Sequence, residues 1–89
     1  MRNRVIDRDN GLDQAALHGL DPDHPMPYIM ADHLEVHHII KADDDPSRRM
    51  DMTNLITLSS HTHALAEQGK IDKDALLKIA KDNCYETNQ

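Results

Sequence analysis

The sequence predicts a small α+β fold: a two-stranded antiparallel hairpin plus a helix, flanked by N- and C-terminal helices. Three observations support this prediction. Segments 34–40 and 55–58 are apolar and have strand length. A long polar stretch separates them, and segments 59–68 and 72–83 carry apolar residues at helical spacing. Because 89 residues is the size of one small domain, we expect a single domain over residues 1–89.

The N-terminal part predicts a short helix followed by a loop. Apolar residues recur at helical spacing between positions 12 and 20, with Asn10 as the expected N-cap and Gly19 as the expected stop. Segment 21–27 contains three prolines, and each proline lacks an N–H donor and restricts the residue before it. We therefore expect an irregular loop that leads into the first strand.

The hairpin is predicted from two apolar segments and the loop between them. Leu34 and Val36 alternate with polar residues along the first strand, and segment 41–52 is polar and acidic, as an exposed loop should be. Segment 55–58 is the expected return strand. The chain thus predicts the order strand, loop, strand, helix.

Two helices are predicted after the hairpin. Ser59 or Ser60 is the expected N-cap of the first, which should run to about Gln68 and end at Gly69. Asp72 is the expected N-cap of the second, whose apolar stripe indicates packing on the core. The tail at 85–89 has no pattern, and we expect it to be frayed.

Composition predicts a thin aliphatic core. The chain has no Trp or Phe and only two Tyr, so the core must consist mainly of Leu, Ile, Val, Met and Ala. The single Cys84 excludes an intrachain disulfide and a multi-cysteine zinc site. No apolar run has the length of a signal or membrane segment. We expect a cytoplasmic protein without membrane partners.

Four residues suggest metal-dependent phosphodiester chemistry: His37, His38, Asn54 and His63. Such chemistry needs imidazoles to hold the cation and a separate base for the attacking water. Successive residues of a strand point to opposite faces, so adjacent histidines cannot do the same job unless the strand bends. This geometry suggests one ligand and one base.

The ordered combination resembles the motif of HNH endonucleases, with a motif core at about 34–68. The resemblance implies a ββα-metal fold and one divalent metal ion: Mg²⁺, Mn²⁺, Ni²⁺ or Zn²⁺. It also implies an endonuclease that hydrolyses phosphodiester bonds, nicking or cutting double-stranded DNA with little sequence specificity and leaving 5′-phosphate products. A domain this small offers few side chains for reading bases.

The resemblance also assigns roles to individual residues. His37 and His63 correspond to metal ligands, His38 to the general base, and Asn54 to the catalytic asparagine that braces the loop. In the colicin nuclease branch a further ligand lies four residues after the last motif histidine. Here that position is Glu67, a candidate third ligand, because residues four apart share a helix face.

The remaining histidines are less clearly assigned. His61 lies two residues before His63 and points to a different side of a regular helix, so it contacts the metal only if the first turn is irregular. It is a candidate metal ligand, with a surface histidine as the alternative. His18, His24 and His33 have no assigned role.

One departure from the family concerns structural zinc. Many members carry two Cys-x-x-Cys pairs, and by spacing these fall here on Ser59 and Thr62 and, less surely, on Asp13 and Ala16. None of these side chains is a thiolate, so we expect no zinc at these four positions and apolar packing in its place.

Net charge is the main argument against a nuclease. Sixteen acidic residues against ten basic ones give −6, the wrong sign for tight binding of DNA by the chain alone. Lys41, Arg48 and Arg49 flank or lie in the hairpin loop and are candidate DNA contacts, although ordinary solvated charges explain them equally well. Arg2, Arg4 and Arg8 form a second basic group. A homodimer or a partner protein would enlarge the basic surface.

Two alternatives remain open. The first is a catalytically inactive accessory of the same fold that binds metal or DNA, which the acidic charge favours and the intact His38 opposes. The second is a metal-storage or sensor site on a small helical protein, which the scattered histidines oppose.

Overall fold

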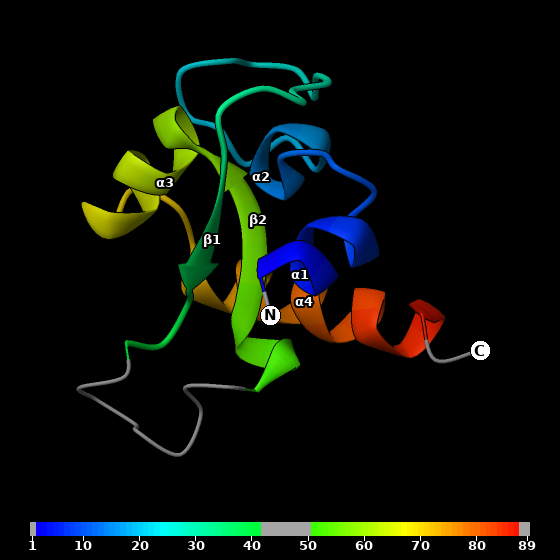
Figure 1. Ribbon diagram of the computed structural model, residues 1–89. Helices are drawn as coiled ribbons and strands as arrows, with labels where there is room; N and C mark the ends of the chain where they lie inside the picture. Colours follow the sequence, from blue (N-terminus) through cyan, green and yellow to red (C-terminus); the bar gives the residue numbers. More distant parts are fainter. Residues whose placement is uncertain (1, 42–50, 88–89) are drawn as a thin grey trace.

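The computed structural model describes residues 2–41 and 51–87. Its elements follow in this order: α1 (Arg2–Arg8), α2 (Gln14–Leu17), β1 (Leu34–His38), η2 (Met52–Asn54), β2 (Leu55–Ser59), α3 (Ser60–Glu67) and α4 (Lys73–Thr87). The two strands form an antiparallel sheet, which confirms the predicted α+β class. In Figure 1, α3 lies beside β1, and α4 crosses the lower half of the hairpin.

The hairpin has a defined register. His37 pairs with Ile56 and His38 with Leu55. His37 is buried and His38 is exposed, as the alternation of a strand requires. Pairing continues one residue past the end of β1, since the Ile39 N–H donates to the Asn54 carbonyl at 2.9 Å. The two adjacent histidines therefore face different environments, as predicted.

The N-terminal helices differ from the prediction. Asn10 and Gly11 both have positive φ, which a helix interior does not accept. The cap therefore moves to Asp13, whose carboxylate accepts the Ala16 N–H, and α2 spans only four residues. Helix α1 precedes this turn and was not predicted from the apolar pattern.

The helices after the hairpin follow the prediction more closely. Ser59 caps α3 by accepting from the Thr62 N–H, and Gly69 takes φ +75° just after the helix. Helix α4 reaches Thr87, so the expectation of a frayed tail from residue 85 was wrong for residues 85–87. Of the predicted loop, residues 42–50 lie outside the described ranges, and Met52–Asn54 forms η2.

The core lies between the hairpin, α3 and α4. Its buried apolar cluster consists of Ala15, Ile39, Ile56, Leu58, Leu65, Ile71, Leu76, Ile79 and Ala80. The predicted aliphatic core is present, and the stripe of α4 contributes to it. Within the described ranges, no helix combines the length and the apolar character that a membrane crossing would need.

Candidate metal centre

His37, His63 and Glu67 converge at one place between β1 and α3. One ligand atom from each lies within 4.8 Å of the others, a spacing that can hold a metal ion. The Glu67 Oε1 is 3.5 Å from the His37 Nδ1 and 3.3 Å from the His63 Nε2. Because His63 and Glu67 are four residues apart on α3, they share the face that meets the strand. The three residues proposed as ligands from sequence are thus brought together.

The imidazole of His37 is held neutral by its surroundings. Its side chain is buried, and its Nδ1 has no hydrogen-bond partner. Burial, followed by the positive charge that His63 can carry, lowers the pKa of His37 to about 4. A neutral imidazole with an unpartnered nitrogen is the form that binds a cation. The residues present therefore fit a divalent metal ion.

Glu35 orients His63 from the opposite side. Its Oε1 lies within hydrogen-bond distance of the His63 Nδ1, which leaves the Nε2 directed toward Glu67. A carboxylate on the second ring nitrogen fixes the tautomer of a ligating histidine and raises its basicity. Sequence reasoning gave Glu35 no role, although its position two residues before His37 places both side chains on one strand face.

A cleft opens beside this group. Its volume is about 450 Å³, and its lining includes His37, Glu67, Lys41 and Lys73. The Lys41 Nζ lies 3.5 Å from the Glu67 Oε2. Burial acts to raise the pKa of Glu67, but the electrostatic interactions with His37 and Lys41 outweigh it and leave the pKa below its ordinary value. The cleft thus combines carboxylate, imidazole and ammonium groups. Of the candidate DNA contacts, Lys41 lies in it, and Arg48 and Arg49 fall outside the described residues.

Asn54 fastens the end of β1. Its Oδ1 accepts the Ile40 N–H at 2.8 Å, and its Nδ2 donates to the Ile40 carbonyl at 2.9 Å. The side chain is fully buried. Asn54 therefore holds the chain just after the two adjacent histidines. His38 is the exposed last residue of β1.

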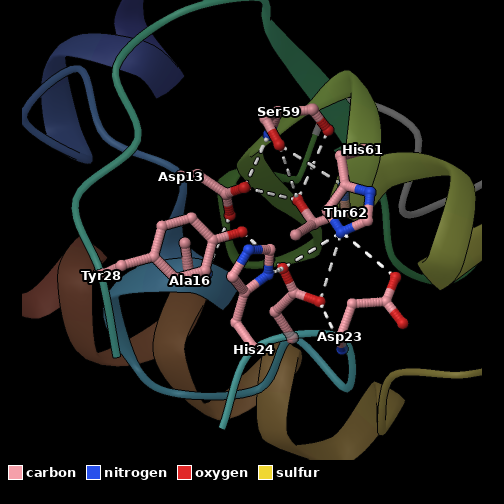
Figure 2. A network of polar contacts seen from close by, with 9 residues as sticks. Asp13, Ala16, Asp23, His24, Tyr28, Ser59, His61 and Thr62 are labelled. Carbon is pink, nitrogen blue, oxygen red and sulfur yellow. Dashed lines mark hydrogen bonds and ion pairs between the residues drawn. The ribbon is translucent and has the colours of Figure 1, made fainter. Parts of the chain in front are cut away.

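Asp13, Ala16, Ser59 and Thr62, the four positions at which the sequence predicted no zinc, do lie together and are joined by hydrogen bonds (Figure 2). The Asp13 Oδ2 accepts the Ser59 N–H at 3.1 Å and the Thr62 hydroxyl at 2.6 Å, while its Oδ1 accepts the Ala16 N–H. The expectation of apolar packing at these positions was wrong. The buried carboxylate of Asp13 joins them, because a carboxylate can accept several donors at once.

Arg8 and Asp9 form a second buried polar group. The Arg8 guanidinium donates to both oxygens of Asp9 and to the carbonyls of Met52 and Leu55. The Asp9 Oδ2 also accepts the Thr57 N–H. Arg8 is therefore an internal residue and not part of a basic surface with Arg2 and Arg4, which are exposed.

His61 lies in a different group from the three ligands above. It is placed with Asp21 and His24, a set that the sequence did not associate. Asp21 and His24 come from the proline-containing loop, and only the tertiary structure brings that loop to α3. The spacing of Asp21 and His24, three residues apart, was the one local signal for this set.

Comparisons with known proteins found no match. No family model, no curated protein and no solved structure matches the chain.

Proposed function

We propose that the chain is a metal-dependent endonuclease of the HNH type that hydrolyses phosphodiester bonds in DNA. The observation that carries the proposal is the convergence of His37, His63 and Glu67, with an unpartnered buried nitrogen on His37. The exposed His38, which follows His37 in the chain, and the hydrogen bonds by which Asn54 holds this end of β1 support the same function. Membership of the HNH family is part of the proposal.

Each residue has a distinct task in the proposed reaction. The divalent ion, Mg²⁺, Mn²⁺, Ni²⁺ or Zn²⁺, would supply Lewis acidity to the phosphate and the leaving 3′ oxygen. His37, His63 and Glu67 would hold this ion, and Glu35 would keep the ring of His63 in place. His38 would accept the proton of the attacking water as general base. Asn54 would keep the end of β1 in the geometry that presents His37 and His38.

Double-stranded DNA is the proposed substrate, with 5′-phosphate products and little sequence preference. Lys41 and Lys73 line the cleft and would meet the phosphate backbone. The net charge of −6 predicts weak binding, and two lysines at the cleft predict only a shallow dependence of that binding on salt. A second copy or a partner protein would strengthen binding. We propose that the protein acts in the cytoplasm.

A supercoiled-plasmid nicking assay tests this function. The untagged chain is assayed with each of the four metals and with chelator, beside His38→Ala and the matched control His18→Ala, an exposed histidine outside both metal groups. We expect metal-dependent nicking that falls about 10²- to 10⁴-fold in His38→Ala, since general-base catalysis contributes on that scale. His18→Ala should cut as the wild type does.

Metal binding by the wild type, His38→Ala and His63→Ala is measured by calorimetry. His38→Ala should bind metal with nearly unchanged affinity, whereas His63→Ala should lose affinity strongly. Normal nicking by His38→Ala would remove it from the base role. A wild type that is inert with every metal would contradict the nuclease proposal and favour the inactive accessory, for which DNA-binding assays are the next test.

A further inference from the structure

A second group of metal-ligating side chains lies apart from the centre described above. Asp21 and His24 belong to the loop between α2 and β1, and His61 lies in the first turn of α3. One ligand atom from each falls within 4.8 Å of the others. Figure 2 shows the rings of His24 and His61 beside Asp23 and Tyr28.

Hydrogen bonds and ion pairs hold this group together, at distances near to or slightly shorter than those between the ligands of a tetrahedral ion. The Asp21 Oδ2 is 2.8 Å from the His24 Nδ1 and 3.1 Å from the His61 Nε2. The Asp23 Oδ2 lies 3.4 Å from the same His61 nitrogen. Bonds of about 2.0–2.1 Å to Zn²⁺ in tetrahedral geometry separate neighbouring ligand atoms by about 3.3 Å. Small movements of the exposed side chains of His24, His61 and Asp23 would complete the coordination.

The central carboxylate is fixed in place before any ion binds. The Asp21 side chain is only 1% exposed. Its Oδ1 accepts the Asp23 N–H at 2.9 Å, and its Oδ2 accepts the Tyr28 hydroxyl. The ring of His24 packs on Tyr28 with centroids 4.4 Å apart. Hydrogen bonds of this kind orient the ligands of metal sites.

We propose that Asp21, His24 and His61 bind one Zn²⁺ ion, with Asp23 or water as the fourth ligand. Two imidazole nitrogens favour zinc over Mg²⁺ or Ca²⁺, which prefer oxygen ligands. The site is structural: it fastens the 21–28 loop to the beginning of α3. This inference does not depend on the proposed nuclease function.

The 21–28 loop is the segment that a bound zinc ion would stabilise most. It has no regular secondary structure, and its main-chain ties to α2 include the Tyr28 N–H to the Ala16 carbonyl at 3.0 Å. The core is small, and a bound metal is one of the ways in which small domains gain stability. A zinc ion here would join the loop to α3 directly.

The test separates the two metal groups. A His63→Ala/Glu67→Gln background disables the first, and zinc binding by the untagged chain is then measured by calorimetry and native mass spectrometry. We expect one zinc ion per chain in this background. Adding His24→Gln should weaken zinc binding more than about 100-fold. Loss of a residue that only hydrogen-bonds to a metal ligand already costs about 10- to 100-fold, and His24 is proposed as a ligand itself. Adding the control His18→Gln should leave it unchanged. Circular dichroism checks that each variant is folded.

A second readout uses the wild-type chain. Zinc should shift the ¹H–¹⁵N imidazole signals of both His24 and His61 and leave those of His18 unmoved. It should also raise the melting midpoint by at least about 5 °C. No zinc bound in the background, equal binding by His24→Gln and His18→Gln, or unmoved signals of His24 and His61 would each overturn the proposal. None of these measurements depends on DNA cleavage, so a negative nicking assay would not contradict the zinc proposal.

Discussion

The imidazole of His37 connects the chemistry of the candidate centre to the stability of the fold. Its ordinary pKa of 6.5 falls to about 4 in the folded chain because of burial first and the charge of His63 second. Between these two values the unfolded chain binds more protons than the folded chain. The metal-free protein therefore loses stability as pH falls through this window.

We predict that the free energy of unfolding of the chelator-treated chain decreases by roughly 3 kcal/mol between pH 7 and pH 4 from His37 alone. The carboxyl of Asp21 contributes at lower pH than His37. Burial acts to raise its pKa, but hydrogen bonds, led by the one from Tyr28, outweigh burial and set the pKa below its ordinary value of 3.8. Urea unfolding across pH measures the loss. The variant His37→Asn should show a flatter profile, and a slope equal to that of the wild type would disprove the assignment.

At the scale of secondary structure, the side chain of Asn54 links η2 to the chain just after β1. Both polar atoms of its side chain are bonded to the main chain of Ile40, one as acceptor and one as donor. No other side chain of this size offers an acceptor and a donor in the same plane at this length. The asparagine therefore sets where the strand that carries His37 ends.

We predict that Asn54→Asp destabilises the fold by about 2–4 kcal/mol, because a buried carboxylate would face the Ile40 carbonyl without a donor between them. Nicking should fall as well. Chemical denaturation measures the difference, with Asn3→Asp on the exposed face of α1 as the control. The deficit should shrink at acidic pH, where a protonated carboxyl can donate. Unchanged stability and kinetics would make the asparagine incidental.

Across the whole molecule, buried carboxylates connect elements that the apolar core does not. Asp13 ties α2 to β2 and α3, and Asp9 ties α1 to β2 through the Thr57 N–H and to α4 through the Asn83 amide. A chain without Trp or Phe has a small core, and these polar contacts give its helices fixed positions around the hairpin. The elements that present the candidate ligands depend on them.

We predict that Asp13→Asn lowers the free energy of unfolding by about 2–4 kcal/mol, because the amide cannot accept all three donors that now meet the carboxylate. The control is Asp72→Asn, an exposed position before α4 where asparagine caps equally well, with an expected change under about 0.5 kcal/mol. Thermal and urea unfolding compare the two. Equal effects would show that the Asp13 contacts contribute little.

Much of the fold was predictable from local sequence. Neighbouring residues alone carry the alternation around His37 and the serine and glycine at the two ends of α3. These signals can therefore be recognised without the tertiary structure. Helix α2 was misplaced because Asn10 and Gly11 adopt a left-handed turn that apolar spacing does not reveal. The convergence of His37, His63 and Glu67 was anticipated only through a resemblance, since strand and helix are more than twenty residues apart.

The sequence by itself determined the order of strands and helices after the N-terminal turn, and the separation of His37 from His38 on opposite faces, because periodicity is a local property. Only the tertiary structure decided that the Asp13 carboxylate joins Ala16, Ser59 and Thr62, that Arg8 is internal, and that His61 meets Asp21 and His24. Each of these contacts joins residues from distant parts of the chain, and a buried carboxylate or imidazole looks no different in sequence from a solvated one.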